Sequence, residues 1–315
     1  MNACTTASRD LAEPVEATAA TAPTWLLIEQ PGPWGAKAAT SSHLDPELGR
    51  ALERAAQGTG VRVALIRRPG PHADPHGPAP RRVYVAHTRP GRSWIRTAEL
   101  GPGSGAGGPE QLLDLDFAAL GAGHHRGLWE AYEGGPLALV CTNGKRDRCC
   151  ALLGRPLAAE LATDGDESVW EVTHIGGHRF APTFVLLPYG YAYGRATAHT
   201  AKGALEAARL GRIVTTGSRG RSAWDRPGQA ADLAVRQLTG EDREDALDVV
   251  RTQARPGGPP PHWTVTVAHT DGRSWQVDVA RSAAEPPRPE SCGAVPGSPA
   301  RMDVLAVRAL PRATG

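Results

Sequence analysis

The strongest constraint in this chain is a set of two cysteines and two histidines that lie on two short segments. Cys141 ends an apolar run and Cys150 follows after a short polar stretch, whereas His174 and His178 enclose Ile-Gly-Gly. Two thiols and two imidazoles make a complete set of four metal ligands. Such a set holds either a tetrahedral zinc ion or a [2Fe-2S] cluster with two Cys on one iron and two His on the other. A fold that uses the set must bring the two segments together.

Five segments of the chain are, in order, WLLIEQPGPWG from Trp25, CTNG from Cys141, DRCC from Asp147, GGHRFA from Gly176 and YGR from Tyr193. Together they resemble the sucrase/ferredoxin-like family, whose core is a thioredoxin-like [2Fe-2S] ferredoxin. The resemblance covers most of residues 25–212. It implies an α/β fold in which an N-terminal α/β extension precedes a thioredoxin-like ferredoxin core.

The resemblance also implies which residues hold the cofactor. Plain thioredoxin-like ferredoxins carry two cysteines in their second loop, and here that pair is His174 and His178, as in the bis-histidinyl branch of the family. The family spacing selects Cys150 rather than its neighbour Cys149 as the partner of Cys141. The [2Fe-2S] cluster and its metal ions would thus be bound by Cys141, Cys150, His174 and His178. Residues expected to lie around these four are Gly144, Asp147, Cys149, Gly176, Gly177, Tyr193 and Arg195.

The local sequence suits these roles. A strand at residues 137–140 would fix the first sulfur, and a helix that begins near Cys150 would present the second, with its dipole lowering the thiol pKa. Gly144 permits a bend that turns backbone amides toward the cluster, and the pair Gly176-Gly177 lets the backbone approach it closely. We expect Asp147 to cap the helix or to hold an arginine rather than to act as an acid.

The ligand types also suggest a function. Two neutral imidazoles in place of two thiolates make the cluster less negative, which raises its reduction potential toward the Rieske range. Each imidazole keeps a second ring nitrogen, so electron transfer becomes coupled to proton transfer. The expected function is electron transfer or redox sensing, with an unidentified reductase or acceptor protein as partner. The chain is then more an electron carrier than a catalyst.

Three other functions remain open. The same four residues could form a zinc-stabilised Cys₂His₂ interaction module. Hydrolysis of sucrose, which the family name suggests, needs a carboxylate pair about the scissile bond, and no acidic pair stands in a recognisable motif. A thiol–disulfide enzyme needs a Cys-x-x-Cys motif, whereas this chain has Cys149 next to Cys150, where a disulfide is strained.

The bulk composition sets few further limits. The 35 basic and 33 acidic residues leave a net charge of +2, which indicates neither a nucleic acid nor an anionic membrane as partner. No apolar stretch reaches membrane-spanning length and residues 1–24 lack the pattern of a secretory signal, so we expect a cytoplasmic protein. Three of the five Cys lie between Cys141 and Cys150, which is typical of a metal or redox site in a reducing compartment.

The sequence pattern divides the chain into parts. We expect a disordered tail at residues 1–24 and an N-terminal α/β part at 25–130, which belongs to the region of family resemblance. The thioredoxin-like [2Fe-2S] domain should occupy residues 131–216, and a small C-terminal α+β module residues 229–315. The Gly-containing segment between these two, residues 217–228, is expected to be a linker.

Within these parts the periodicity predicts individual elements. The thioredoxin-like domain should contain a strand, a helix, three strands and a helix, which is the thioredoxin order with one helix dropped. In the C-terminal module, alternating segments about Asp271-Gly272 predict a hairpin, and residues 246–253 continue the helical pattern of residues 230–238. We find no internal repeat. Cys4 lies in the expected tail, and Cys292 is expected to be a structural or surface thiol.

Overall fold

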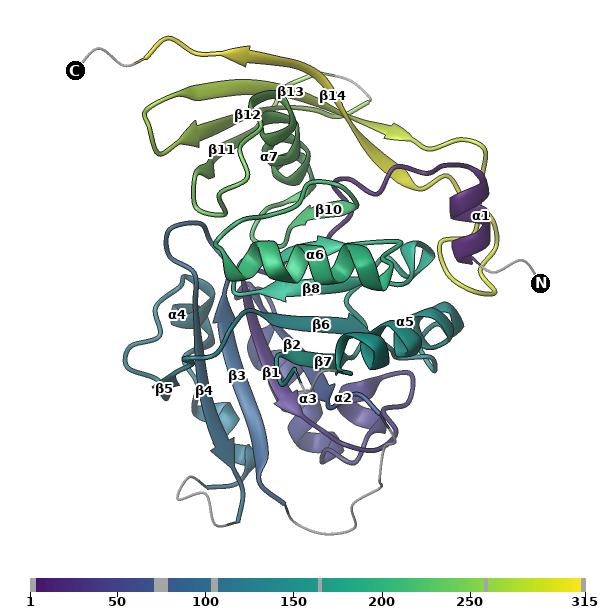
Figure 1. Cartoon of the computed structure of the whole chain (residues 1–315), viewed down its shortest axis with the longest axis vertical. Coiled ribbons are helices and arrows are strands. Elements are labelled where there is room, and N and C mark those ends of the chain that lie inside the picture. Colours follow the sequence, from purple (N-terminus) through teal and green to yellow (C-terminus); the bar gives the residue numbers. More distant parts are fainter. Residues whose placement is uncertain (1–3, 71–78, 103–106, 164–165, 258–259, 313–315) are drawn as a thin grey trace.

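The computed structural model describes residues 4–70, 79–102, 107–163, 166–257 and 260–312. The protein has a mixed α/β fold with one ten-stranded sheet and a second, four-stranded sheet at one end (Figure 1). The strands of the large sheet are β1 (Thr24–Glu29), β2 (Val61–Arg67), β3 (Arg81–His87), β4 (Trp94–Leu100), β5 (Glu130–Ala131), β6 (Leu137–Cys141), β7 (Val169–Val172), β8 (Phe184–Leu187), β9 (Tyr191–Tyr193) and β10 (Ser218–Arg221). The helices are α1 (Cys4–Asp10), α2 (Ala38–Ser41), α3 (Pro46–Ala56), α4 (Phe117–Gly121), α5 (Arg148–Leu161), α6 (Ala198–Arg209) and α7 (Arg226–Thr239), with the 3-10 helices η1 (Pro109–Asp114) and η2 (His178–Phe180).

The large sheet is built from two halves with the same strand arrangement. Its order is β10-β9-β8-β6-β7-β2-β1-β3-β4-β5, so that β7-β6-β8-β9-β10 on one side of the centre mirrors β2-β1-β3-β4-β5 on the other. In each half the first two strands are parallel, the third is antiparallel to the first, and the fourth is antiparallel to the third. This repeat lies in the topology and not in the residues, where the sequence analysis found no internal repeat.

The two halves join edge to edge. Strands β2 and β7 pair antiparallel through Ile66↔Val172 and Arg67↔Glu171, which makes one continuous sheet out of the regions expected at residues 25–130 and 131–216. The second half runs β6, α5, β7, β8, β9, α6, so the predicted thioredoxin order with one helix dropped is confirmed. A local capping residue fixes the start of α5. The carboxylate of Asp147 accepts a hydrogen bond from the backbone N–H of Cys149 in the first turn of this helix.

Helices cover one face of the large sheet. Helices α5 and α6 pack on the face of β6 that carries Val140, and α3 and α4 pack on the matching face of β1, which carries Leu26 and Ile28. The opposite face buries large aromatic side chains such as Trp170, and it also carries Cys141. The alternation of side chains along a strand thus separates the helix-covered core from the face that holds the first candidate ligand.

The N-terminal segment is part of the folded body, which corrects the expectation of a disordered tail for the described residues 4–24. Helix α1 buries Cys4 completely, and Ala17 farther along the segment is also fully buried. The backbone N–H of Thr18 donates to the carbonyl of Arg219 in β10 at 3.0 Å. The alanines of this segment show no helical or strand periodicity, so the sequence did not indicate a folded structure. Their small side chains nevertheless pack closely against a neighbouring strand.

The segment expected to be a linker, residues 217–228, is instead structured and largely buried. Its first part is β10, which pairs antiparallel with β9 at the edge of the large sheet. The side chains of Arg219 and Arg221 in this strand are fully buried. A run of Gly, Ser and Arg resembles a flexible connector in sequence, but here the arginines make buried hydrogen bonds.

The C-terminal module consists of α7 packed on an antiparallel sheet of β11 (Leu247–Ala254), β12 (His262–His269), β13 (Ser274–Ala283) and β14 (Ala300–Ala309). The hairpin predicted about Asp271-Gly272 is confirmed by the pairing of β12 with β13. The helix predicted at residues 246–253 is wrong, because this segment forms the edge strand β11. Its residues Val249, Val250 and Thr252 are β-branched, and pairing with β12 outweighs the helical spacing. Among the described residues, no helix is both long and apolar enough to cross a membrane.

Candidate metal centre

The two candidate thiols meet where β6 ends and α5 begins. Cys141 is the last residue of β6, and Cys150 lies in the first turn of α5; each is 1% exposed. The connecting loop is held by Asp147, which caps α5 and is itself buried. Gly144 lies close against this helix, since a Cβ at its position would lie 2.5 Å from the Cβ of Ala151. The loop can pack this closely against α5 because the residue nearest to Ala151 is a glycine without a side chain.

The two candidate imidazoles follow β7, the strand that lies parallel to β6. Carboxyl ends of parallel strands meet at one edge of a sheet, so the loop after β7 lies beside the loop after β6. Gly176 and Gly177 both have positive φ angles, +82° and +69°, which lets the loop turn tightly between the two histidines. As a result the rings of His174 and His178 lie 4.9 Å apart, measured between their centroids.

These loops bring the candidate ligands together. One ligand atom each of Cys141, Cys150 and His174 lies within 4.8 Å of the others, and His178 stands next to this group through its ring contact with His174. The Nδ1 atoms of both histidines are buried, and within the described part of the chain neither has a hydrogen-bond partner. An unpaired buried nitrogen is costly, and coordination to a metal would satisfy it. The residues present therefore fit a metal-containing group.

The electrostatics of the group follow from burial and from its own hydrogen bonds. A hydrogen bond from Cys150 lowers the pKa of the Cys141 thiol, and the neighbouring His174 lowers it further against the effect of burial. The same shared proton, together with burial, raises the pKa of Cys150. Burial lowers the pKa of His178, while the nearby carboxylate of Asp147 opposes this shift. A thiolate at Cys141 and a neutral imidazole at His178 are therefore favoured, and these are the forms that bind metals.

The family model of sucrase/ferredoxin-like proteins matches residues 15–220, which is more than half of the chain. The chain belongs to the sucrase/ferredoxin-like family. The matched span includes both halves of the large sheet and all four candidate ligands, and it ends within β10 before the C-terminal module. No curated protein and no solved structure matches the chain.

Two arginines at the site of this sucrase/ferredoxin-like protein were not predicted: Arg219, which is fully buried, and Arg62, which is half-buried. Arg219 donates to the carbonyl of Gly176 at 3.0 Å, and Arg62 donates to the carbonyl of His174 at 2.7 Å. Burial lowers the pKa of Arg219 to about 9, and the charge of Cys141 opposes this shift for both arginines. No motif indicated their role. They lie far from the ligands in sequence, and Arg219 lies in the expected linker.

Arg219 also explains one of the glycines. A Cβ on Gly177 would lie 2.1 Å from the Arg219 guanidinium, so the space beside this glycine is filled by the arginine. The expectation that Gly177 opens room for backbone contact with a cluster is thus replaced by a packing reason. Gly176 has only the Cβ of Ala20 near its own missing side chain, at 3.8 Å.

The remaining predicted neighbours divide into two groups. Asp147 caps α5 as expected, and its Oδ2 also lies 3.9 Å from Nε2 of His178. Cys149 faces away from Cys141, toward Cys4 and Cys292.

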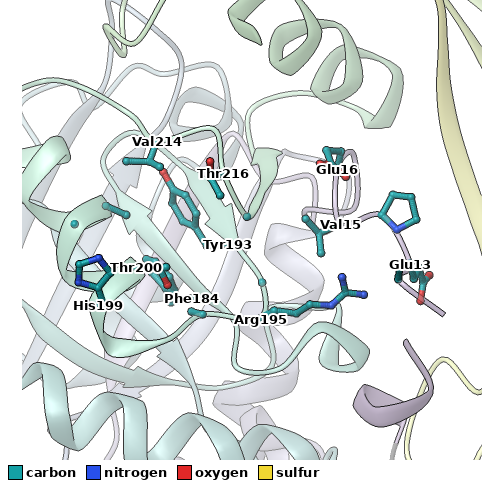
Figure 2. A pocket seen from close by; sticks show the side chains of 17 residues that line it. Glu13, Val15, Glu16, Phe184, Tyr193, Arg195, His199, Thr200, Val214 and Thr216 are labelled. Carbon is teal, nitrogen blue, oxygen red and sulfur yellow. The ribbon is translucent and has the colours of Figure 1, made fainter. Parts of the chain in front are cut away.

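Tyr193 and Arg195 lie apart from the thiols. The Tyr193 ring stacks on Phe184 at 4.8 Å, on the helix-covered face of the sheet, whereas Cys141 is on the other face. Both residues line a cavity of about 730 Å³ between this face and the N-terminal segment (Figure 2). Arg195 donates to the carbonyl of Ser8 at 2.8 Å, and its backbone N–H donates to Phe180 at 2.6 Å. Arg195 therefore stabilises η2, the 3-10 helix that contains His178, without contacting the thiols.

Proposed function

We propose that this protein carries one [2Fe-2S] cluster and serves in electron transfer or redox sensing. Cys141 and Cys150 would hold one iron, and His174 and His178 the other. The observation that carries the proposal is the convergence of two buried thiols and two imidazoles with unpaired Nδ1 atoms at the carboxyl ends of two parallel strands. Such a cluster, when bound, accepts and releases one electron at a time.

The spacing of the ligand atoms favours a two-metal centre over a single zinc ion. A tetrahedral zinc places all four ligand atoms within about 4 Å of one another. Among the described residues, the ligand atoms of Cys141, Cys150 and His174 lie within 4.8 Å of one another, and His178 lies beside this group without belonging to it. A centre with two metals needs ligands spread over a longer distance. The zinc-stabilised Cys₂His₂ module is therefore the second candidate.

The surrounding residues suit a centre that gains negative charge. The buried Arg219 and the half-buried Arg62 lie beside the loop of His174, and each interacts electrostatically with Cys141. Fixed positive charges in a medium of low polarity stabilise an added electron, so they raise the reduction potential. The arginines thus act in the same direction as the replacement of two thiolates by imidazoles.

The route for the electron is set by exposure. The two cysteines are buried, whereas both histidines are half-buried. The side chain of His178 is 16% exposed, and the carboxylate of Asp147 lies beside it. A reductase or acceptor protein would therefore dock over the histidine loop. Asp147 lies 3.9 Å from Nε2 of His178, where it can stabilise a proton on that nitrogen. This arrangement supports the coupling of electron and proton transfer.

Iron and sulfide analysis of protein made with adequate iron supply tests the proposal. We expect about two irons and two sulfides per chain, a red-brown colour and an EPR signal on reduction. Zinc that is lost from the Cys150→Ala and His174→Ala variants, without sulfide in the unsubstituted protein, would establish the zinc module instead.

A further inference from the structure

A second group of metal-ligand side chains lies next to the candidate cluster site and shares none of its four residues. It consists of Cys4 in α1, Asp147 and Cys149 at the start of α5, and Cys292 in the loop that leads to β14. One ligand atom of each lies within 4.8 Å of all the others. Figure 1 shows α1 beside the loop before β14, although these segments lie at opposite ends of the chain.

The distances within this group are close to those of a metal site. The sulfur of Cys4 lies 3.7 Å from that of Cys149 and 3.6 Å from that of Cys292, and both carboxylate oxygens of Asp147 lie 3.9 Å from it. Two thiolates on one tetrahedral zinc, with bonds of about 2.3 Å, are separated by about 3.8 Å. The sulfurs of Cys149 and Cys292, at 3.0 Å, would have to move slightly apart.

The fourth position is prepared by hydrogen bonds. The carboxylate of Asp147 accepts the backbone N–H of Cys149 at 3.0 Å and that of Cys292 at 2.8 Å. These bonds fix its orientation and leave lone pairs free, since an ionised carboxylate can accept about four bonds. Asp147 is fully buried, and the three cysteines are buried or half-buried. The carboxylate is therefore held in place before any metal binds.

We propose that Cys4, Cys149, Cys292 and Asp147 bind a structural zinc ion. Three soft sulfur ligands and one carboxylate oxygen, all buried or half-buried, are ligand types that zinc accepts in tetrahedral sites. The ion fastens the N-terminal helix and the loop before β14 to the start of α5. It also gives Cys149 a role that differs from that of its neighbour Cys150.

A network of ion pairs joins the N-terminal segment and the loop before β14 to η2, and it supports this role. Glu13 pairs with Arg179 at 2.9 Å and with Arg288 at 3.1 Å, and Arg179 also pairs with Glu290 at 2.9 Å. Glu13 and Arg288 are buried. By contrast, α1 has seven residues and is too short to be stable by itself. Its position therefore depends on what it binds here, and a zinc ion supplies the strongest such contact.

Metal analysis of the full-length protein tests the site. We expect about one zinc per chain in addition to any iron. Zinc content should fall at least about tenfold in the variants Cys4→Ser and Cys292→Ser, while their iron content and visible spectrum stay unchanged. Cys150→Ala is the matched control, because it should lose iron and keep zinc. The two assignments use different residues, so either one can fail without the other.

A measurement on the unsubstituted protein avoids any folding defect in the variants. Alkylation followed by peptide mass spectrometry should find Cys4, Cys149 and Cys292 protected, and should find them modified after a chelator has removed the zinc. Three outcomes would overturn the proposal: absence of zinc, a disulfide between Cys149 and Cys292 seen as the loss of two hydrogens, or loss of iron from Cys4→Ser.

Discussion

The two halves of the large sheet share one strand arrangement, but among the residues that the structure describes only the second half brings candidate Cys and His ligands together at the ends of its first two strands. Cys141 pairs with Val172, Val172 with Ile66, and Ile66 with Glu29. Cys141 and Glu29 are thus the last residues of equivalent strands, and their side chains point to the same face. The carboxylate of Glu29 accepts the backbone N–H of Arg82 at 3.0 Å and takes part in packing the first half.

The loops that follow these strands differ in the same way. After β1, the indole of Trp34 is buried and donates to Gln30 at 2.8 Å, and the guanidinium of Arg67 lies 4.0 Å from the Trp34 ring centre. At the end of β6, by contrast, Cys141 and Cys150 lie in the core on the opposite face of the sheet. An aromatic ring therefore lies beyond the end of β1 in the first half, whereas thiols lie at the end of β6 in the second half. A common topology therefore supplies the position, and the residues at the strand ends decide the chemistry.

The largest expected difference between the halves concerns iron. Cys150→Ala should lose all bound iron because a thiolate ligand is missing, whereas Glu29→Ala and Cys149→Ala should keep about two irons per chain. Iron content and visible absorption of the three variants measure this. If Cys149→Ala lost the iron and Cys150→Ala kept it, the ligand would be Cys149.

The seam between the halves should be the next most sensitive place. Glu171 in β7 forms a buried ion pair with Arg67 in β2 at 2.8 Å, and it also accepts the hydroxyl of Thr142 at 2.8 Å. Glu171→Ala leaves the buried charge of Arg67 without this partner and should lower the free energy of unfolding by about 3–5 kcal/mol. Urea denaturation measures the change.

An exposed pair in the first half provides the control for this seam variant. Glu99 pairs with Arg82 on the surface, where half of the Glu99 side chain is exposed. Glu99→Ala should cost less than about 1 kcal/mol. Equal losses in the two variants would show that the buried pair does not join the halves energetically.

A buried histidine in the first half should show itself in the pH dependence of stability. His87 is 1% exposed and its Nδ1 shares a hydrogen bond with Thr24 at 2.8 Å, unlike the unpaired Nδ1 atoms of His174 and His178. Burial, with Arg89 next, lowers the pKa of His87 from 6.5 to about 4. Between about pH 4 and about pH 6.5, His87 is therefore protonated in the unfolded chain but neutral in the folded protein.

The sign of the effect follows from this difference in proton binding. Stability is fully present above about pH 6.5 and falls by about 3 kcal/mol as the pH drops to about 4. Denaturation midpoints measured across this range should show the loss in the native protein and a smaller loss in His87→Gln. An identical pH dependence in both proteins would contradict a buried neutral His87.

The smallest expected effect is on the reduction potential. If His174 and His178 are ligands, the potential should fall as pH rises, by up to about 59 mV per unit for each coupled proton. His178→Cys should flatten this slope and lower the potential because a thiolate adds negative charge. Protein-film voltammetry measures both, and Glu29→Gln in the other half should leave the slope unchanged. A flat potential between about pH 6 and about pH 10 in the unmodified protein would contradict the assignment.

Much of the second half could be predicted because its signals are local. The apolar run before Cys141, the capping Asp147 and the hairpin turn at Asp271-Gly272 each act over a few residues, and the structure has all three elements. The glycine pair between His174 and His178 likewise indicated a tight loop. By contrast, the helix expected at residues 246–253 failed because pairing with another strand overrode a local preference.

The sequence by itself determined the ligand-type residues, the family and the thioredoxin order of the second half. Only the tertiary structure showed the repeated topology, the buried Arg219 and the meeting of Cys4 with Cys149, which are 145 positions apart. The physical reason is the range of the forces involved. Caps, turns and periodicity depend on near neighbours, whereas edge pairing of β2 with β7 and the docking of α1 depend on surfaces that exist only after the rest of the chain has folded.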